Sequence, residues 1–326
     1  MNEVMSGVSG VCSIFHTIAI AIMPCLFFLT ALLLSTLPLT TPNPTTTPPP
    51  LHWALLIAGS SDPADLRHAA GTAALGRALA ARSPATSLHL FLAHPPQDWA
   101  PAVTALVSPA AGALPVPPLA AVGPDVTPAL VLAALTATHP RWHPPAWRLP
   151  RGNAPTASTA LVFLAGHGGP GFIRVGGGSL TSTALAAGLR AALAKGLAAR
   201  VLLVTDTCRA ASLLPSPPSP FVTSLASAGV DEASHSGGFW HGDGAGGWRG
   251  ATAERFTAAL VDALLLEEGR QDPKPATLAS LLARPAFAPS TLLSTPSVVG
   301  NASWLVTDFF GSDREGQTEE PGGCVS

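Results

Sequence analysis

The chain has 326 residues, of which 47% are apolar and 11% are charged. This length can hold one large α/β domain with appendages, and the charged share lies below the roughly 25% of soluble domains. The chain has 17 basic and 19 acidic residues, which gives a formal charge of −2. It therefore lacks the excess of basic residues that binds phosphate backbones. Nucleic acid is therefore not expected as a partner.

The N-terminal part of the sequence predicts entry into the secretory pathway. Residues 11–37 carry no charge, and a run of more than about 18 such residues can span a bilayer. The ten residues before it hold no Lys or Arg, which a simple signal peptide would have. We therefore interpret residues 1–37 as a signal peptide or signal anchor, with cleavage left open. Residues 38–50 form a Thr/Pro linker that cannot continue a helix.

Short apolar runs alternate with helical patterns after this linker, which predicts a parallel sheet covered by helices. The predicted strands are 52–58, 87–93, 159–165, 201–205 and 303–307. The predicted helices are 63–81, 128–138, 181–200, 252–268 and 276–282.

Two of these helices have clear local signals. Asp62 before Pro63 is typical of an N-cap followed by the first helical residue. In the helix at 181–200, leucines recur every four residues from Leu185 to Leu197, so one stripe is expected to face the sheet. Residues 102–106 and 221–226 are too short to assign from their pattern.

The remaining stretches are rich in Pro or Gly and are predicted to be irregular. They are 94–125, 139–158, 212–220 and 229–250. Loops of such length inside a domain are usually functional or disordered. We expect the catalytic domain to cover residues 51–314, followed by a polar tail at 315–326.

A histidine and a cysteine each follow an apolar strand. TALVFLAG runs into His167, and VLLVTDT runs into Cys208. If both strands are parallel members of one sheet, both residues emerge at its carboxyl edge, where open α/β sheets bind ligands. A thiolate near an imidazole is a nucleophile, and the glycines around His167 let backbone N–H groups approach a substrate. The N–H groups of Gly168 and Cys208 could then form an oxyanion hole.

Each of these features also has a simpler interpretation. A lone Gly-His-Gly is typical of a turn with a surface histidine, and a lone cysteine is typical of a small buried hydrophobe. Cys12 and Cys25 lie in the apolar run and Cys324 near the chain end, so no disulfide framework is predicted. The joint placement of His167 and Cys208 after successive predicted strands favours the catalytic interpretation.

These segments resemble a known family. LAGHGGPGF around His167 and LVTDTCRAA around Cys208 resemble the Gly-His-Gly-Gly and Asp-Thr-Cys segments of the catalytic subunits of GPI-anchor transamidases. SLASAGVDEASH at 224–235 resembles the Ser-rich stretch after the nucleophile, and LVTDFFGS at 305–312 resembles the closing strand. The resemblance starts near Trp53 and includes the Arg67-His68 pair.

The resemblance implies a caspase-like three-layer α/β fold, with a mostly parallel central sheet of about six strands and helices on both faces. It implies His167 as acid/base, Cys208 as nucleophile and the Gly168 N–H in the oxyanion hole. Further residues are implied near the substrate pocket, namely Asp65, Arg67, His68, Ser227 and Asp231 or Glu232.

The chain departs from the family pattern in three places. Asp65-Leu66 stands where the family has Asn-Tyr, so a charge replaces an amide. Residues 94–122 lack the family's acidic cluster, so no calcium is expected there. The end of the chain lacks the C-terminal membrane helix of many members. His235, His241 and Asp243 stand in Gly-rich surroundings that supply no ligand scaffold, and neither a metal site nor a cofactor is predicted.

The resemblance implies a cysteine transamidase of the endoplasmic reticulum membrane with a lumenal catalytic domain. Its implied partners are the other subunits of the complex, proproteins with C-terminal attachment signals, and the GPI lipid. Two alternatives stay open: a legumain-like asparaginyl endopeptidase of a vacuole, and a non-catalytic binding module on the same fold.

Overall fold

The computed structural model describes residues 51–62, 65–83, 86–95, 98, 119–138, 158–215, 218–241, 249–266 and 276–310. The chain divides into two units after Thr47, and all of the first unit lies outside the described residues. The predicted leader, linker and polar tail therefore stay predictions. Among the described residues, no helix is long and apolar enough to cross a membrane.

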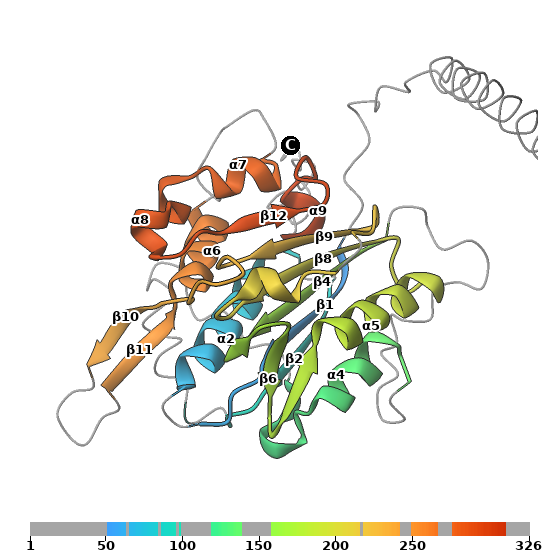
Figure 1. Cartoon of the computed structure of the whole chain (residues 1–326), viewed down its shortest axis with the longest axis horizontal. Coiled ribbons are helices and arrows are strands. Elements are labelled where there is room, and N and C mark those ends of the chain that lie inside the picture. Colours follow the sequence, from blue (N-terminus) through green and yellow to red (C-terminus); the bar gives the residue numbers. More distant parts are fainter. Residues whose placement is uncertain are drawn as a thin grey trace, which may run out of the picture. The chain divides into compact units, whose positions relative to one another are not determined.

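A seven-stranded sheet forms the centre of the second unit (Figure 1). Its order is β12-β9-β8-β4-β1-β2-β3. The strands are β1 (Leu51–Ala58), β2 (Ser87–Leu92), β3 (Leu119–Val122), β4 (Thr159–Ala165), β8 (Arg200–Asp206), β9 (Val222–Ala226) and β12 (Ser297–Val299). All neighbours pair in parallel except β12, which runs antiparallel to β9. The predicted α/β class with a mostly parallel sheet is confirmed.

Helices cover both faces of this sheet (Figure 1). One face packs against α2 (Leu66–Arg82), α6 (Arg255–Leu266), α7 (Leu278–Leu282) and α9 (Thr307–Phe310). The other face packs against α4 (Pro128–Leu135) and α5 (Ser182–Ala194). The short helical segments η3 (Gly123–Asp125), η5 (Ala210–Leu213), η7 (Pro285–Phe287) and α8 (Pro289–Leu292) complete the helices that the structure describes.

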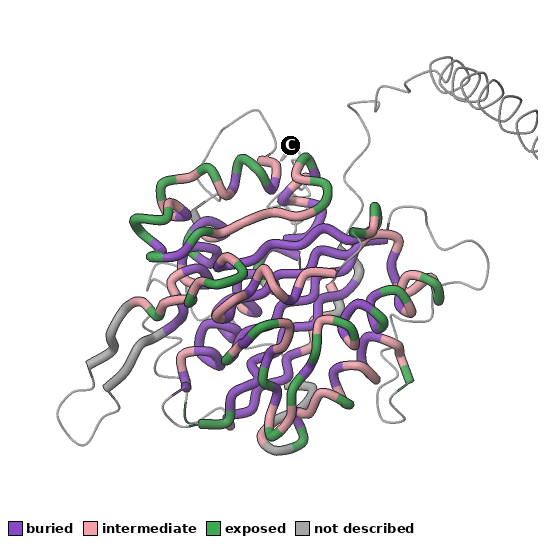
Figure 2. Tube along the Cα trace, in the orientation of Figure 1, coloured by how far each residue is buried: buried purple, intermediate pink, exposed green. Residues whose placement is uncertain are grey.

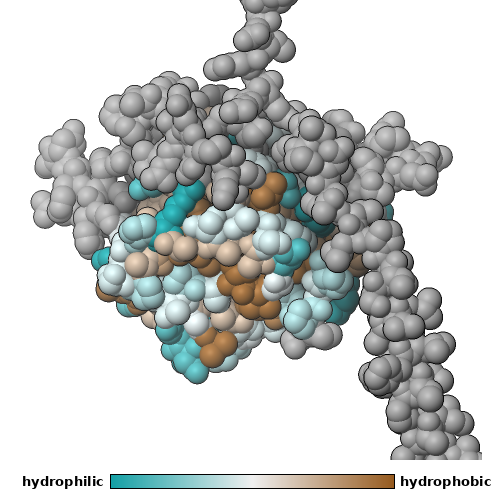
Figure 3. All heavy atoms as spheres, turned by 90° about the horizontal axis from the view of Figure 1, so that it is seen from above, coloured by the Kyte–Doolittle hydropathy of each residue, from teal (hydrophilic) through white to brown (hydrophobic). Residues whose placement is uncertain are grey.

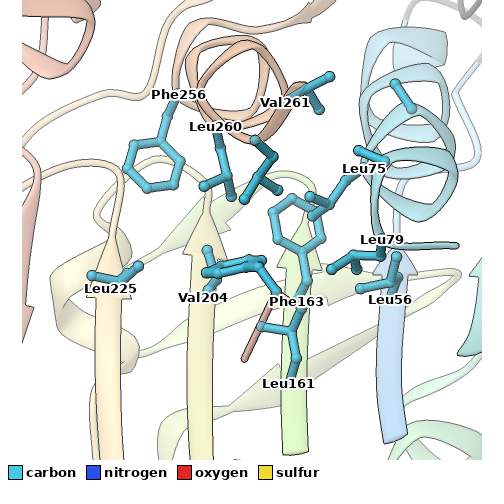
Figure 4. Close-up of a cluster of buried hydrophobic side chains, with 14 of the residues drawn as sticks. Leu56, Leu75, Leu79, Leu161, Phe163, Val204, Leu225, Phe256, Leu260 and Val261 are labelled. Atoms are coloured by element: carbon cyan, nitrogen blue, oxygen red, sulfur yellow. The ribbon is translucent and has the colours of Figure 1, made fainter. Parts of the chain in front are cut away.

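Apolar side chains on both faces of the central strands explain why helices cover the sheet on both sides and form three layers. In β4, Leu161 and Phe163 belong to the core under α2 and α6, whereas Val162 and Leu164 belong to the core under α4 and α5. Successive side chains of a strand point to opposite faces, and a parallel sheet buries both faces. Figure 4 shows Phe163 surrounded by side chains of α2 and α6, with Leu79 among them.

The last residues of the central strands β1, β4 and β8 are buried (Figure 2). Exposed large apolar side chains among the described residues are Phe221, Val230 and Leu293, which come from three separate segments. The face in Figure 3 accordingly mixes apolar groups with polar ones. The two larger cores contain most of the buried apolar side chains of the described residues.

Two small antiparallel sheets extend the carboxyl edge. The first contains β5 (Gly168–Gly169), β6 (Phe172–Val175) and β7 (Gly178–Thr181), and it leads directly into α5. The second pairs β10 (Ser236–His241) with β11 (Arg249–Glu254), which leads into α6. Sequence patterns predicted neither sheet, because their strands are short and rich in glycine.

Several predicted boundaries are wrong. Residues 303–307 form a turn and the start of α9 instead of a strand; within this stretch Leu305 makes an isolated bridge to Thr277, and β12 supplies the edge strand. Helix α2 begins at Leu66, three residues later than the predicted first helical residue Pro63, and its N-cap is Asp65 instead of Asp62. Helix α5 ends at Ala194, six residues early. Gly196 follows with a φ of 68°, a left-handed conformation that ends a helix.

Three strands of the central sheet, β3, β9 and β12, were not predicted as strands from the sequence. Residues 222–226, too short to assign, form the buried strand β9, and β3 lies inside the stretch predicted to be irregular. Burial from both faces, and not residue pattern, distinguishes such short strands. The other predicted helices and strands are confirmed with small shifts of their ends, as expected for boundaries.

Candidate active site

Strands β4 and β8 bring His167 and Cys208 to the same edge of the sheet. The two strands pair in register from Thr159–Arg200 to Ala165–Asp206. His167 and Cys208 each lie two residues beyond that last pair, and neighbouring strands lie about 4.8 Å apart. The Gly166 N–H also donates to the Asp206 carbonyl at 3.3 Å. The predicted common position of these two residues is therefore a feature of the structure.

Gly168 packs against the backbone of the cysteine segment. A Cβ atom at this position would collide with Thr207 Oγ1 and with the carbonyl oxygen of Cys208. The two strand-end loops thus touch at a point that only glycine can occupy without displacement. Cys208 itself is a free, half-buried cysteine, with its Sγ 3.9 Å from the carbonyl oxygen of Ser234.

The turn after Cys208 is unusual. Arg209 has a φ of 57°, in the left-handed region that residues other than glycine seldom adopt. Its N–H donates to the Glu232 carbonyl at 2.7 Å, and its carbonyl accepts from Ser212 Oγ at 2.7 Å. Ser212 Oγ also accepts from the Gly171 N–H at 2.9 Å. These contacts hold the cysteine turn against the histidine loop.

Asp65, at the start of α2, holds the histidine. Asp65 Oδ2 lies 2.6 Å from His167 Nε2. Burial would raise the pKa of Asp65, but the hydrogen bond from Ser60 and the charges of His167 and Arg67 outweigh it and hold that pKa below its ordinary value. An ionised carboxylate can only accept, so Nε2 carries the proton. Nδ1 is then the nitrogen that can exchange a proton with a thiol.

A chain of charged contacts continues behind Asp65. Arg67 Nη1 lies 2.7 Å from Asp65 Oδ1, and Arg67 Nε lies 2.8 Å from Glu254 Oε1. Burial, together with the nearby charge of Asp206, raises the pKa of Glu254 to about 7. The last residue of β11 is therefore connected through one guanidinium to the carboxylate that holds His167.

His68 is buried beside this chain. It is 2% exposed, and its ring meets that of His167 edge to face at a centroid distance of 5.5 Å. Burial and the charge of Arg67 lower the pKa of His68 to about 3, so the imidazole is neutral at physiological pH. Neither ring nitrogen has a hydrogen-bond partner among the residues that the structure describes, although Nδ1 lies 3.4 Å from Glu254 Oε1.

Asp206 is the last residue of β8, two residues before Cys208. Its fully buried carboxylate accepts from the Thr257 N–H at 3.0 Å, from Thr257 Oγ1 at 2.5 Å and from Ser234 Oγ at 2.8 Å. Burial raises the pKa of Asp206, and the hydrogen bonds from Thr257 and Ser234 reduce that rise. Because Thr257 stands in the first turn of α6, Asp206 also caps the positive end of that helix.

The other expected pocket residues fall into two groups. Ser227 is buried behind the cysteine turn, where its Oγ accepts from the Thr207 N–H at 3.3 Å. Asp231 is exposed. Its neighbour Glu232 accepts from the N–H groups of Gly229 and Thr295 at 2.9 and 2.6 Å, which lower the pKa of Glu232. The structure thus brings Asp65, Arg67 and His68 to His167, and Ser227 to the cysteine turn.

Comparison with known proteins gives one curated relative. The chain is 32% identical over 166 residues to the GPI-anchor transamidase of Schizosaccharomyces pombe. The resemblance to GPI-anchor transamidases is thereby confirmed. The match covers 48% of this chain and 41% of that transamidase, so the chain spans less than half of its length.

Two further comparisons complete the picture. No family model matches the chain. Among solved structures, the crystal structure of caspase-1 from Spodoptera frugiperda is similar, with a TM-score of 0.45 and 10% sequence identity, covering 84% of this chain and 94% of that one.

Sequence reasoning missed Glu254, Ser60 and Ser234 as parts of the candidate active site. Glu254 stood within a range predicted to be helical, and it is instead the last residue of β11. No spacing or motif connects it with Arg67, 187 residues earlier. The one available signal was general: the chain has few charged residues, and a carboxylate that is buried needs a charged or hydrogen-bonding partner.

Proposed function

We propose that this chain transfers the C-terminus of a proprotein to an amine through a thioester on Cys208, as the catalytic subunit of a GPI-anchor transamidase. The observation that carries the proposal is the shared edge of β4 and β8, with His167 held by Asp65 at 2.6 Å and Cys208 two residues beyond the same strand pair. The sequence similarity to a GPI-anchor transamidase supports the choice of reaction.

The proposed first half-reaction forms the thioester. His167 Nδ1 takes the proton of the Cys208 thiol, and the thiolate attacks the carbonyl at the attachment site. The Gly168 and Cys208 N–H groups are the proposed donors to the oxyanion. His167 then gives its proton to the departing amine of the signal peptide, so the C–N bond breaks and the acyl group stays on sulfur.

The proposed second half-reaction reverses the proton path. The ethanolamine amine of GPI attacks the thioester, His167 accepts a proton from that amine, and the C–S bond breaks. Throughout both steps Asp65 stabilises the imidazolium and keeps the proton of His167 on Nε2. Water has to be excluded, and we propose that partner subunits of a complex in the endoplasmic reticulum membrane help to do so around a lumenal catalytic domain.

The testing experiment is complementation of cells that lack their own transamidase catalytic subunit. The chain and its Cys208→Ala variant are compared by surface display of a GPI-anchored reporter, with equal amounts of protein in the endoplasmic reticulum. Rescue that requires Cys208 is the expected result. Reporter that is cleaved and secreted without an anchor would point to a legumain-like endopeptidase, and uncleaved reporter with both forms would point to a binding module.

Asp65→Asn is expected to slow anchoring about tenfold, because the amide oxygen can still accept from Nε2 while the charge that stabilises the imidazolium is lost. A tenfold change corresponds to about 1.4 kcal/mol, the size of a partly exposed charge interaction. Pulse–chase labelling of the reporter measures the rate. Asp125→Asn, at an exposed position on η3, serves as the matched control, and an equal slowing in both variants would contradict the role of Asp65.

A further inference from the structure

Three ligand groups converge on one point beside the proposed active site. Asp65, His68 and His167 each offer one ligand atom, and these atoms lie within 4.8 Å of one another. Two of the residues come from the start of α2, one turn apart, and the third comes from the loop after β4. The site therefore depends on the tertiary contact between these segments and has no sequence signature of its own.

The donor set suits a particular class of cation. Two imidazoles and one carboxylate are the ligands of catalytic-type zinc sites, which leave a fourth position open. Hard cations such as Mg²⁺ and Ca²⁺ prefer oxygen-only sites. We propose that Asp65, His68 and His167 form a Zn²⁺ site that blocks His167 when it is occupied.

His68 supplies the independent observation. A buried polar group without a hydrogen bond is unfavourable, yet within the described part of the chain both nitrogens of this 2%-exposed ring lack one. A neutral imidazole in this state has a lone pair available for a metal. Glu254 Oε1, 3.4 Å from His68 Nδ1, stands where zinc sites commonly have an outer carboxylate that orients the histidine.

The geometry needs one adjustment. Zn–N distances of about 2.0–2.1 Å place tetrahedral ligand atoms about 3.4 Å apart. Asp65 Oδ2 and His167 Nε2, 2.6 Å apart, must therefore separate by about 0.8 Å, and a pair of ligand atoms near the 4.8 Å limit must approach by about 1.4 Å. Asp65 and His68 are buried, but the His167 side chain is 54% exposed and lies between Gly166 and Gly168. The His167 side chain is therefore the ligand that packing restricts least.

The charges around Asp65 both oppose and favour the binding of Zn²⁺. Asp65 Oδ1 is occupied by Arg67, a positive charge that opposes a cation. Oδ2 faces His167 Nε2 at 2.6 Å, so Zn²⁺ takes the place of the proton shared between these atoms. Binding thus removes the Asp65–His167 hydrogen bond. The inhibitory half of the inference rests on the proposed function, whereas metal binding itself does not.

The test uses the full chain in detergent, carrying Cys208→Ala so that it is inactive and has no thiol at the site. After removal of metals by a chelator, ZnCl₂ is titrated against the protein in competition with a chromophoric chelator. We expect the protein to bind Zn²⁺, and we expect an additional His68→Gln change to lower its Zn²⁺ affinity at least about tenfold. Neither form should bind Mg²⁺. Equal Zn²⁺ affinity in both forms, or no stoichiometric binding, would overturn the proposal.

Two measurements keep the result specific. X-ray absorption of the bound zinc should give nitrogen and oxygen ligands without sulfur, which separates this site from binding by cysteines elsewhere in the chain. If His68→Gln does not fold by circular dichroism, Asp65→Asn replaces it, because it keeps the size of the side chain. In the active chain, anchoring that Zn²⁺ does not inhibit despite stoichiometric binding would remove only the inhibitory half.

Discussion

Replacing Gly168 by alanine is expected to lower the rate of anchoring about 100-fold or more. The added Cβ collides with Thr207 Oγ1 and with the carbonyl oxygen of Cys208, and neither group can move without shifting the cysteine turn. Displacement of a reacting group by about 1 Å can reduce a rate 100-fold. The proposed oxyanion donor and the nucleophile move apart together. Surface display of the reporter, corrected for the amount of protein, measures the effect.

The matched control is Gly177→Ala. A Cβ at Gly177 meets nothing within 4 Å, and the position lies in the neighbouring turn between β6 and β7. This variant should anchor the reporter at the wild-type rate. If Gly168→Ala also does so, the histidine loop does not form the oxyanion hole as proposed. Thermal unfolding of both variants checks that the difference lies in the site.

Replacing Asp206 by alanine is expected to lower the free energy of unfolding by about 2–4 kcal/mol. The change leaves the buried Thr257 N–H and the hydroxyl groups of Thr257 and Ser234 without their acceptor. It also removes the negative charge at the start of α6. Denaturant unfolding of the purified chain, followed by circular dichroism, measures the difference between the two midpoints.

Asp206→Asn separates the hydrogen bonds from the charge. The amide oxygen can accept from Thr257, and the amide nitrogen can donate to Ser234 Oγ, because a hydroxyl both donates and accepts. Burial raises the pKa of Asp206, which means that the fold disfavours its ionised form, so a neutral amide should cost less than about 1 kcal/mol. A loss as large as that of alanine would show that the charge, and not the hydrogen bonds, stabilises the fold.

The sequence by itself determined four strands of the central sheet, β1, β2, β4 and β8, and the candidate dyad. Apolar runs of five to seven residues bounded by turns predict buried parallel strands, and His167 and Cys208 directly follow two of them. Because the carboxyl ends of parallel strands share one edge, local patterns sufficed to bring these two residues together. The expectation that Arg67, His68 and Ser227 lie near the substrate pocket came only from the family resemblance.

Tertiary structure alone decided how the dyad is supported. Asp65 precedes His167 by 102 residues, and Arg67 precedes Glu254 by 187, so no spacing along the chain predicts either contact. Short strands such as β9 and β12 likewise depend on pairing with neighbours, since their residue patterns also fit loops. Periodicity reports which face of one segment is buried. Which charged side chains contact each other, as Arg67 contacts Glu254, depends on how distant segments pack together. Local sequence patterns do not contain that information.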